Sequence, residues 1–436
     1  MFNNIQSIIL NIEQKKYTVG IIGLGYVGLP LVFCFVEKGF KSIGFDIDTK
    51  KIENLLQGKS YIKHISSERI QKANTSKLFS ATTDFSNIKK CNAVIIAVPT
   101  PLNKNREPDM EYIVSTCETL YPHLQKGQLI VLESTTYPGT TVEVMIPILE
   151  KSGLKVDKDF YVAFSPERED PNNPNYTTET IPKVVGSTSK DGLEIANKLY
   201  QQIVIKTVPV SSTQVAEATK LMENIFRSVN IALVNELKIT FMKMGIDIWE
   251  VIEAAKTKPF GYMPFYPGPG LGGHCIPIDP FYLTWKAREY GITTKFIELA
   301  GEINTAMPDF VVQRVMEVLN EYGKPLKKSK ILLLGLAYKA NVDDDRESPS
   351  YHLMEKLEEK GAIVEYHDPY VPVIKPTREH PKYAGKKSVE ISNNFDLLLI
   401  STAHDEYKKL DFGKFTIPIV DTRNVVHKNL KNLFKA

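Results

Sequence analysis

One cysteine in the sequence stands next to an unusually glycine-rich segment. Residues 267–280 contain four glycines between positions 268 and 273, and Cys275 follows shortly after the last of them. Glycine loses much conformational freedom on folding, so a plain connector has no need of so many. The composition favours a backbone that folds closely around a ligand and presents one side chain to it. The other three cysteines lie in apolar runs and are typical of small buried residues, namely Cys34, Cys91 and Cys117.

A second group of glycines has the spacing of a dinucleotide-binding turn. An apolar run at residues 19–22 leads into Gly23, Gly25 and Gly28. These would permit the tight turn, the approach of a pyrophosphate and helix–strand packing, with the phosphates at the helix N-terminus. A second apolar run ends at Asp46, eighteen residues after Gly28, where a carboxylate can accept ribose hydroxyls and would repel a 2′-phosphate. The spacing predicts NAD; a glycine turn in an unrelated βαβ unit is the alternative.

Further cofactor contacts are expected beside these glycines and where the next predicted strands end. The carboxyl ends of parallel strands form the edge at which such sheets bind ligands. The residues expected to contact the cofactor are Tyr26, Val27, Lys51, Pro99, Thr100 and Thr135. Thr135 is expected on the nicotinamide side. A solvated lysine is the alternative for Lys51, and a simple connector is the alternative for the proline-containing segments.

A nucleophilic cysteine beside an NAD site suggests oxidation of an aldehyde. The thiolate adds to the carbonyl, hydride leaves to NAD as a thioester forms, and water then releases an acid. Such chemistry needs a cation or amide at the oxyanion and a carboxylate to manage water. Lys220 and Asn224 are four residues apart on an expected helix and so share one face, and Glu167 follows an apolar run. An exposed Lys–Asn pair and a solvated acidic turn are the alternatives.

The elements that must position these residues form three blocks. Short apolar runs alternate with helical stretches over residues 1–210, which predicts a parallel sheet buried on both faces. Residues 211–322 are helical around a Pro/Gly-rich stretch, and residues 323–436 alternate again. The fold predicted is α/β, with two Rossmann-like doubly wound domains joined by a central helical domain. Strands are expected at Val19–Ile22, Ile43–Phe45, Ala93–Val98, Leu129–Leu132, Tyr161–Phe164, Ile331–Gly335, Ile363–Tyr366, Asp396–Ser401 and Ile417–Val420.

The composition excludes several classes of protein. Of the 436 residues, 43% are hydrophobic and 24% charged, as in ordinary globular proteins. Lys plus Arg is 54 and Asp plus Glu is 51, too near balance to indicate a nucleic-acid or membrane-surface partner. No apolar run approaches the roughly 20 residues of a transmembrane helix, and the first ten residues do not form a secretory signal. The scattered cysteines indicate reduced thiols, so we expect a cytoplasmic protein without a disulfide frame or metal site.

The order of these motifs resembles that of the UDP-glucose/GDP-mannose dehydrogenase family, the nucleotide-sugar 6-dehydrogenases. The resemblance covers nearly the whole chain after residue 17. It rests on residues 23–28, 133–141, 164–170, 217–236, 267–280 and 339–349. Within the family, residues 164–170 and 258–271 look most like the UDP-N-acetylglucosamine 6-dehydrogenase branch.

The resemblance implies a role for each of the candidate residues in a four-electron oxidation of a sugar C6 hydroxyl to a carboxylate. Cys275 would be the nucleophile, Lys220 and Asn224 would stabilise the alkoxide and the thiohemiacetal oxygen, and Glu167 with Thr135 would assist water. Asp279 is implied in the catalytic network, although N-capping of the following helix also accounts for it. Substrate contacts are implied for Glu167, Arg168, Lys220, Asn224, Gly272, Lys339 and Arg423, and a contact to the cofactor pyrophosphate for Arg346.

The substrate implied is a UDP-N-acetylhexosamine, with UDP-N-acetylglucosamine first and UDP-glucose or UDP-N-acetylmannosamine as alternatives. The product would serve surface polysaccharide synthesis, such as capsule or O-antigen. Phe260–Pro267 is aromatic and proline-rich where UDP-glucose enzymes typically bring an arginine to the substrate, which we interpret as altered sugar recognition. His274 is expected to serve loop packing.

Two more distant readings stay open. The first, a two-electron β-hydroxyacid dehydrogenase, would explain Lys220 and Asn224 but not Cys275. The second is a non-enzymatic NAD-binding regulator. The family resemblance further implies a homodimer through the central helices. Residues 1–16 carry no clear signal beyond a short docking helix.

Overall fold

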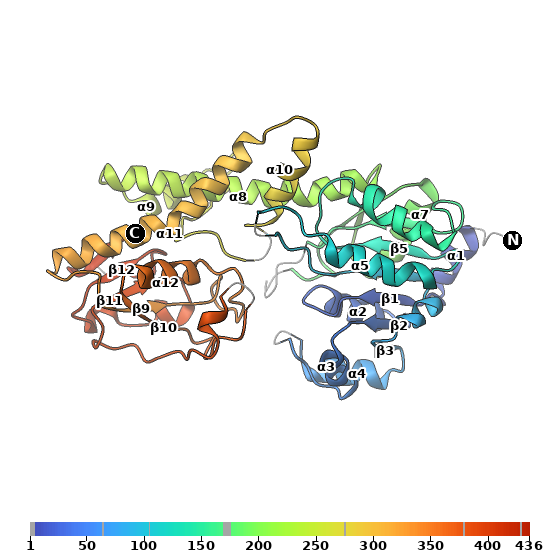
Figure 1. Ribbon diagram of the computed structural model, residues 1–436, viewed down its shortest axis with the longest axis horizontal. Helices are drawn as coiled ribbons and strands as arrows, with labels where there is room; N and C mark the ends of the chain where they lie inside the picture. The colour runs from blue at the N-terminus through green and yellow to red at the C-terminus, as the bar shows by residue number, and fades with distance from the viewer. Residues whose placement is uncertain are drawn as a thin grey trace. The chain divides into compact units, whose positions relative to one another are not determined.

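The structure, a computed structural model, divides into two compact units. The first comprises residues 1–223 and 281–292, and the second comprises residues 224–280 and 293–436. Each unit is built around its own sheet (Figure 1). The residues that the structure describes are 5–62, 65–103, 105–168, 176–273, 276–377, 380–427 and 430–436.

The sheet of the first unit has eight strands in the order β3-β2-β1-β4-β5-β6-β7-β8. Neighbouring strands are parallel except for β6 and β7, which are antiparallel. The strands are β1 (Val19–Ile22), β2 (Ser42–Phe45), β3 (Phe79–Thr82), β4 (Ala93–Ile96), β5 (Leu129–Leu132), β6 (Tyr161–Phe164), β7 (Lys183–Ser187) and β8 (Thr207–Pro209). The five expected strands are present. The strands β3, β7 and β8 were not expected, because each contains polar residues or proline that interrupt an apolar run.

Helices cover both faces of this sheet. Successive strand residues point to opposite faces, so Ile21 and Ile22 of β1 belong to two different apolar clusters. The cluster on one face includes Ile12 and Leu199, and the cluster on the other face includes Ile113. The helices are α1 (Ile5–Glu13), α2 (Gly28–Glu37), α3 (Thr49–Leu56), α4 (Ser67–Thr75), α5 (Glu111–Leu120), α6 (Ile146–Leu149) and α7 (Lys190–Tyr200). The sheet is therefore doubly wound, as the near-continuous apolar strands predicted.

The middle of the chain is helical, as expected. It contains α8 (Thr213–Lys243), α9 (Ile248–Ala255), α10 (Asp279–Glu289) and α11 (Lys295–Glu321). These helices do not form a third compact unit, because the residues of α8 are divided between the two units after Glu223. The predicted domain boundaries after residues 210 and 322 stay a prediction. Within the described ranges, no helix is both long enough and apolar enough to cross a membrane.

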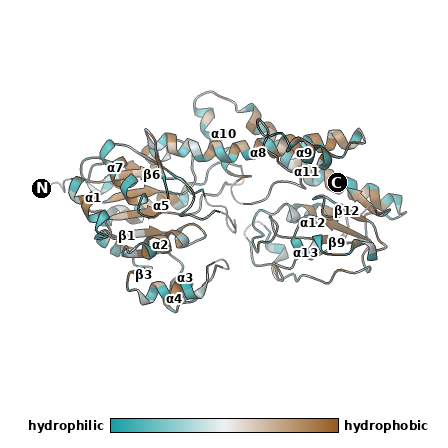
Figure 2. Ribbon diagram, turned by 180° about the vertical axis from the view of Figure 1, so that it is seen from behind, coloured by the Kyte–Doolittle hydropathy of each residue, from teal (hydrophilic) through white to brown (hydrophobic). Residues whose placement is uncertain are grey.

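The sheet of the second unit has five parallel strands in the order β10-β9-β11-β12-β13. They are β9 (Lys330–Leu334), β10 (Ile363–His367), β11 (Leu397–Ile400), β12 (Ile419–Asp421) and β13 (Leu433–Lys435). Residues from α11 and α12 (Pro349–Glu359) join the apolar cluster on one face, and Tyr407 of the short α13 (Asp405–Lys408) joins the other. Hydrophobic residues are concentrated in the strands of both units, as Figure 2 shows. The fold class predicted from the sequence is confirmed.

Candidate active site

The first glycine-rich turn joins β1 to α2. Gly23 has φ +92°, which side chains of L-residues disfavour. A Cβ on Gly28 would lie 1.9 Å from the carbonyl oxygen of Gly23, so helix and strand pack too closely for any other residue. A Cβ on Gly25 would meet no atom within 4 Å, so open space lies beside the backbone there. Val27, the N-cap of α2, has no polar side chain that could accept the N–H groups of the first turn. These N–H groups are therefore suited to bind a phosphate.

Asp46 lies directly after β2 and is buried. Its Oδ2 accepts the N–H of Leu24 at 2.9 Å and the ammonium of Lys51 at 3.0 Å, and its Oδ1 accepts the N–H of Asp48 at 3.0 Å. The carboxylate therefore holds the glycine turn from the ribose side, and Lys51 lies in the site instead of extending into solvent. Together with the open space beside Gly25, these residues fit NAD.

The corresponding turn of the second unit differs in its hydrogen bonds. Asp368 follows β10, and its Oδ2 accepts the N–H groups of Leu336 (2.6 Å) and Ala337 (2.9 Å) and pairs with Nε2 of buried His404 at 3.1 Å. Burial alone would raise the pKa of Asp368, but these bonds outweigh burial and hold the pKa below its usual value. Asp368 thus holds the turn after β9 through internal hydrogen bonds, much as Asp46 holds the turn after β1, with buried His404 as an additional partner.

The ends of β4 and β5 lie side by side at the carboxyl edge of the first sheet. The hydroxyl of Ser134 accepts the N–H of Val98 at 2.9 Å and donates to its carbonyl oxygen at 2.7 Å, which ties the two following loops together. Pro99 and Thr100 continue one loop, and Thr135 continues the other. Thr135 is half-buried at this edge.

The loop after β6 carries Glu167 and Arg168. Oε1 of Glu167 accepts the N–H of Arg168 at 2.7 Å. The guanidinium of Arg168 donates to the carbonyl of Pro182 at 2.6 Å and pairs with Glu223 of α8 at 2.6 Å. The structure therefore brings Arg168 onto the helix turn that carries Lys220. Nearby Glu169 and Asp170, which belong to the same sequence motif, lie outside the described residues.

Lys220 and Asn224 are buried on α8, with 8% and 4% of their surfaces exposed. The alternative of an exposed helical pair is therefore wrong. The side-chain amide of Asn224 donates to Oδ2 of Asp279 at 2.5 Å, and Asp279 is the first residue of α10. The carboxylate thus fixes the direction of the amide. Lys220, four residues earlier, lies on the same face of α8.

Glu217, one helical turn before Lys220, holds the beginning of α8. Its Oε2 accepts the N–H of Gly139 at 2.6 Å, and its Oε1 accepts the N–H of Thr141 at 2.9 Å and the hydroxyl of Thr141 at 2.6 Å. Burial raises the pKa of Glu217. The sequence analysis did not assign Glu217 a function, although it opens one of the resemblance motifs.

A second group of polar residues that the sequence analysis missed surrounds Glu133, two residues before Thr135. Lys183 and Glu133 form a buried ion pair at 3.0 Å, and the hydroxyl of Tyr200 donates to the same carboxylate. Burial raises the pKa of Glu133. Lys183 begins a strand that the sequence pattern did not reveal, so no signal placed it near Glu133.

The glycine-rich segment before Cys275 packs against side chains of the second unit. The N–H of Gly268 donates to Oδ1 of Asn235 on α8 at 3.0 Å. A Cβ on Gly268 would lie 2.3 Å from a guanidinium nitrogen of Arg423, and a Cβ on Gly272 would lie 2.9 Å from Tyr338. A side chain at Gly272 would therefore clash with its neighbours, and one at Gly268 would displace the end of Arg423. His274 and Cys275 themselves lie outside the described residues.

The three candidate cations of the second unit have different surroundings. Nε of Arg423 donates to the carbonyl of Ser401 at 2.9 Å, beside the glycine-rich segment. Lys339 is half-buried and follows Tyr338, which contacts that segment. Arg346 is exposed and forms a two-pronged ion pair with Asp344, at 2.9 and 2.6 Å. The structure therefore places Arg423 and Tyr338, the residue before Lys339, beside the glycine-rich segment. Arg346 lies on the surface of this unit.

The fold and these residues define a class of protein. A doubly wound sheet with a glycine turn, an acid after its second strand and polar side chains at its carboxyl edge is typical of NAD-dependent oxidoreductases. In the part of the chain that the structure describes, no three His, Cys, Asp or Glu side chains are grouped to hold a metal ion.

Comparison with known proteins narrows this class. Three domain models of the UDP-glucose/GDP-mannose dehydrogenase family match the chain: the NAD binding domain at residues 17–204, the central domain at 214–306 and the UDP binding domain at 332–428. The chain therefore belongs to the UDP-glucose/GDP-mannose dehydrogenase family. It is an NAD-dependent nucleotide-sugar 6-dehydrogenase that acts on a UDP-sugar.

Two curated relatives and one solved structure are similar over nearly the whole chain. A UDP-N-acetyl-D-glucosamine 6-dehydrogenase from Pseudomonas aeruginosa is 36% identical over 91% of this chain and 93% of its own. The enzyme of the same name from Salmonella typhi is 34% identical over 95% of this chain and 97% of its own. The structure of a UDP-D-ManNAc dehydrogenase from Pyrococcus horikoshii matches with a TM-score of 0.86 and 30% identity, covering 96% of this chain and 98% of that one.

Proposed function

We propose that the chain oxidises the C6 hydroxyl of UDP-N-acetylglucosamine to a carboxylate in two NAD-dependent steps. The observation that carries the proposal is the burial of Lys220 and Asn224, together with the hydrogen bond from Asn224 to Asp279, which follows Cys275 by four residues in the sequence. A lysine and a fixed amide on one helix face suit an oxygen that gains negative charge. The names of the two curated relatives support N-acetylglucosamine as the sugar.

Each candidate catalytic residue has its own role in the two oxidation steps and the final hydrolysis. NAD, when bound, would supply the oxidising power by accepting a hydride from C6 in each of the two steps. In the first, Lys220 stabilises the C6 oxygen as its proton passes to solvent water and the hydride leaves C6, which yields the aldehyde. The Cys275 thiolate then forms a bond to C6, with the oxygen held by Lys220 and Asn224, and loss of a second hydride leaves a thioester. Water, oriented by Glu167 and Thr135, adds to the carbonyl and gives up a proton to the surrounding solvent; the C–S bond breaks, which returns the thiolate and releases the acid.

The remaining site residues would bind the cofactor and the nucleotide. Gly23, Gly25, Tyr26, Val27 and Gly28 would hold the cofactor's phosphates, and Asp46 the ribose. The other cofactor contacts proposed are Lys51, Pro99, Thr100 and Arg346, and the other substrate contacts are Arg168, Gly272, Lys339 and Arg423. We further place the enzyme in the cytoplasm, supplying a uronic acid for surface polysaccharide such as capsule or O-antigen.

An exposed apolar face on α8 supports a homodimer. Met222, Phe226 and Leu233 are 67%, 47% and 52% exposed, and their spacing places them on one side of the helix. Large apolar side chains in a row along a helix usually mark an interaction surface. A second copy of the chain would cover this face.

The function is tested by measuring NADH release from equal amounts of UDP-N-acetylglucosamine, UDP-N-acetylmannosamine and UDP-glucose. We expect kcat/KM to be highest for UDP-N-acetylglucosamine and the yield to reach two NADH per sugar. Preference for UDP-N-acetylmannosamine would contradict the sugar assignment and agree with the Pyrococcus horikoshii relative instead. One NADH per sugar would indicate a two-electron dehydrogenase, and none would indicate a regulator.

A further inference from the structure

Lys238 is a buried lysine on α8 that the proposed reaction does not use. Its side chain is 3% exposed, and its ammonium nitrogen has no hydrogen-bond partner among the residues that the structure describes. An ammonium group is strongly destabilised when it leaves water without gaining a partner. Asn235, one turn earlier, is fully engaged: it accepts the Gly268 N–H at 3.0 Å and donates to Asn304 at 2.9 Å. The two buried residues of this turn therefore differ, and Lys238 alone lacks a partner.

The charged groups that face Lys238 are Arg423, Asp421 and Lys435. Asp421 is the one carboxylate among them, and it is already engaged. Its Oδ1 accepts the N–H of Arg423 at 3.0 Å, and its Oδ2 accepts the N–H of Val426 at 3.0 Å and the ammonium of Lys435 at 3.1 Å. Burial, with repulsion from Arg423, lowers the pKa of Lys238 to about 7. Three cations share one occupied carboxylate, so the cluster lacks negative charge.

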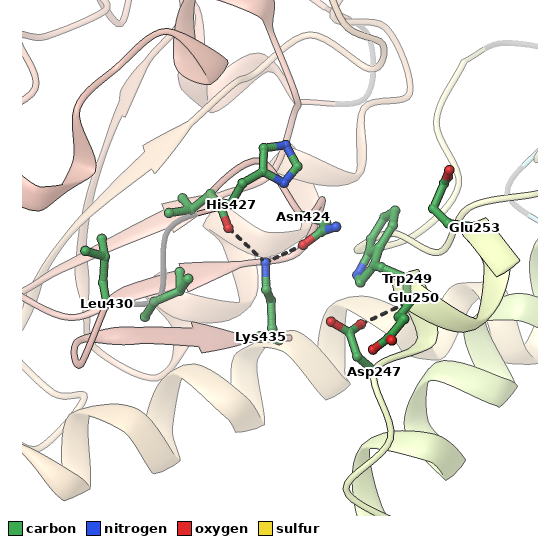
Figure 3. A pocket seen from close by; sticks show the side chains of 10 residues that line it. Asp247, Trp249, Glu250, Glu253, Asn424, His427, Leu430 and Lys435 are labelled. Atoms are coloured by element: carbon green, nitrogen blue, oxygen red, sulfur yellow. Dashed lines mark hydrogen bonds between the residues drawn. The ribbon is translucent and has the colours of Figure 1, made fainter.

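Figure 3 shows why Lys435 does not need a further anion. Its ammonium donates to Oδ1 of Asn424 at 2.6 Å and to the carbonyl of Val426 at 3.4 Å, in addition to Asp421. The pocket in that figure, about 740 Å³, is lined by the carboxyl groups of Asp247, Glu250 and Glu253, which would repel an anion. Within this cluster, Lys238 and Arg423 are therefore the cations whose charge a bound anion would offset.

The position of this pair in the fold is one at which a ligand is expected. Asp421 ends β12, and the carboxyl ends of parallel strands form the ligand-binding edge of such sheets. The Arg423 guanidinium packs against the backbone of Gly268, in the glycine-rich segment that leads to Cys275. An anionic group of a bound substrate in this place would meet Arg423 and Lys238 together.

We propose that Lys238 is a further substrate-binding residue, which together with Arg423 binds the diphosphate of the nucleotide sugar. The inference rests on the proposed function, because it takes the UDP-sugar as the ligand. Phosphate oxygens supply the acceptors that the ammonium lacks, and their charge offsets that of both cations. Binding then stabilises the charged form of Lys238, so the protein takes up a proton when it binds substrate above neutral pH.

Calorimetric titration with UDP-N-acetylglucosamine, without NAD so that no turnover occurs, tests this proposal. Lys238→Met keeps the length of the side chain and removes its charge, and we expect Kd to rise about tenfold or more. Lys243→Met, at the exposed end of the same helix, is the matched control and should leave Kd unchanged. At pH 8, titrations in two buffers of different ionisation enthalpy should show proton uptake by the wild type and by Lys243→Met, but not by Lys238→Met.

Thermal unfolding of the free proteins separates binding from a structural role. Lys238→Met removes an unpaired buried charge, so its Tm should equal or exceed that of the wild type. Equal Kd and equal proton uptake in the wild type and Lys238→Met would overturn the proposal. A weakened Kd together with a lowered Tm of the free variant would also overturn it, because Lys238 would then support the fold. Wild-type protein that binds no UDP-sugar of the panel would instead overturn the proposed function, and this inference with it.

Discussion

At the scale of single residues, burial decides what Lys220 and Asn224 can do. Their spacing fits a solvated pair equally well, but the structure leaves them almost without exposure. A cation and an amide act much more strongly on a developing charge where water is excluded. The hydrogen bond from Asn224 to Asp279 also fixes the direction of the amide. Two ordinary helix residues thereby become candidates for stabilising an oxyanion.

The nucleophile is the residue whose replacement should have the largest effect. Cys275→Ser is expected to lower kcat for NADH release by about a thousandfold or more, because a hydroxyl is a far weaker nucleophile than a thiolate. Binding of UDP-N-acetylglucosamine, measured by calorimetry, should change little. Cys91→Ala is the control, since burial raises the pKa of Cys91 to about 12 and keeps it protonated. Full turnover by Cys275→Ser would remove this cysteine from the mechanism.

At the scale of elements, α8 is the part of the chain on which most of the proposed chemistry depends. One continuous helix carries Glu217, Lys220, Asn224 and Lys238. A helix fixes the spacing and direction of its side chains, so an anchor at one turn determines where the next turns lie. Glu217 is such an anchor, because it binds the N–H groups of Gly139 and Thr141 after β5. The loop that carries Thr135 and the helix that carries Lys220 are thus held together.

Replacing this anchor tests its role. Glu217→Gln puts an amide N–H₂ against N–H donors, so we expect the free energy of unfolding to fall by about 1–3 kcal/mol. We also expect kcat to fall more than substrate affinity, because Lys220 is displaced while the groups of the second unit are not. Thermal unfolding and steady-state kinetics measure both effects.

Glu236→Gln, at an exposed position of the same helix, controls for the change of charge and should match the wild type. Unchanged stability of Glu217→Gln would mean that the hydrogen bonds from Gly139 and Thr141 do not anchor α8.

At the scale of the whole molecule, the chain forms two compact units that share one helix. The apolar face of α8 is exposed in a single chain, which is why a second copy is proposed to cover it. Leu233→Glu places a charge on this face and should shift the protein from dimer to monomer in light scattering, because burying a carboxylate in an apolar interface is costly. Val373→Glu changes an exposed apolar residue elsewhere and should leave the dimer intact. A wild-type protein that is monomeric would contradict the dimer.

The sequence was informative where local physics decides the outcome. Gly23 and Gly28 were recognised from spacing because only glycine satisfies the backbone geometry and the helix–strand contact. The buried strands β1, β4, β5 and β6 were found because strands covered on both faces must be apolar along their whole length. Asp46 was found because it follows such a strand at a fixed distance from the glycines.

Pairings between distant segments left no such local signal. Lys183 lies in a strand whose composition is mixed, and its partner Glu133 is fifty residues away. Lys238 was passed over because a lysine in a helix is usually solvated, and only its burial in the folded chain, near Arg423 and Asp421, shows otherwise.

By itself the sequence determined the α/β fold, the presence of an NAD-binding domain and the family, because each depends on residue types at fixed short spacings. The tertiary structure decided which polar side chains are buried and what each of them contacts. Burial and partnership arise from segments that meet in space, so they set the free-energy cost of a charge in ways that no local spacing records. For this reason, only the folded chain shows that Glu217 anchors α8 and that the buried ammonium of Lys238 lacks a hydrogen-bond partner among the described residues.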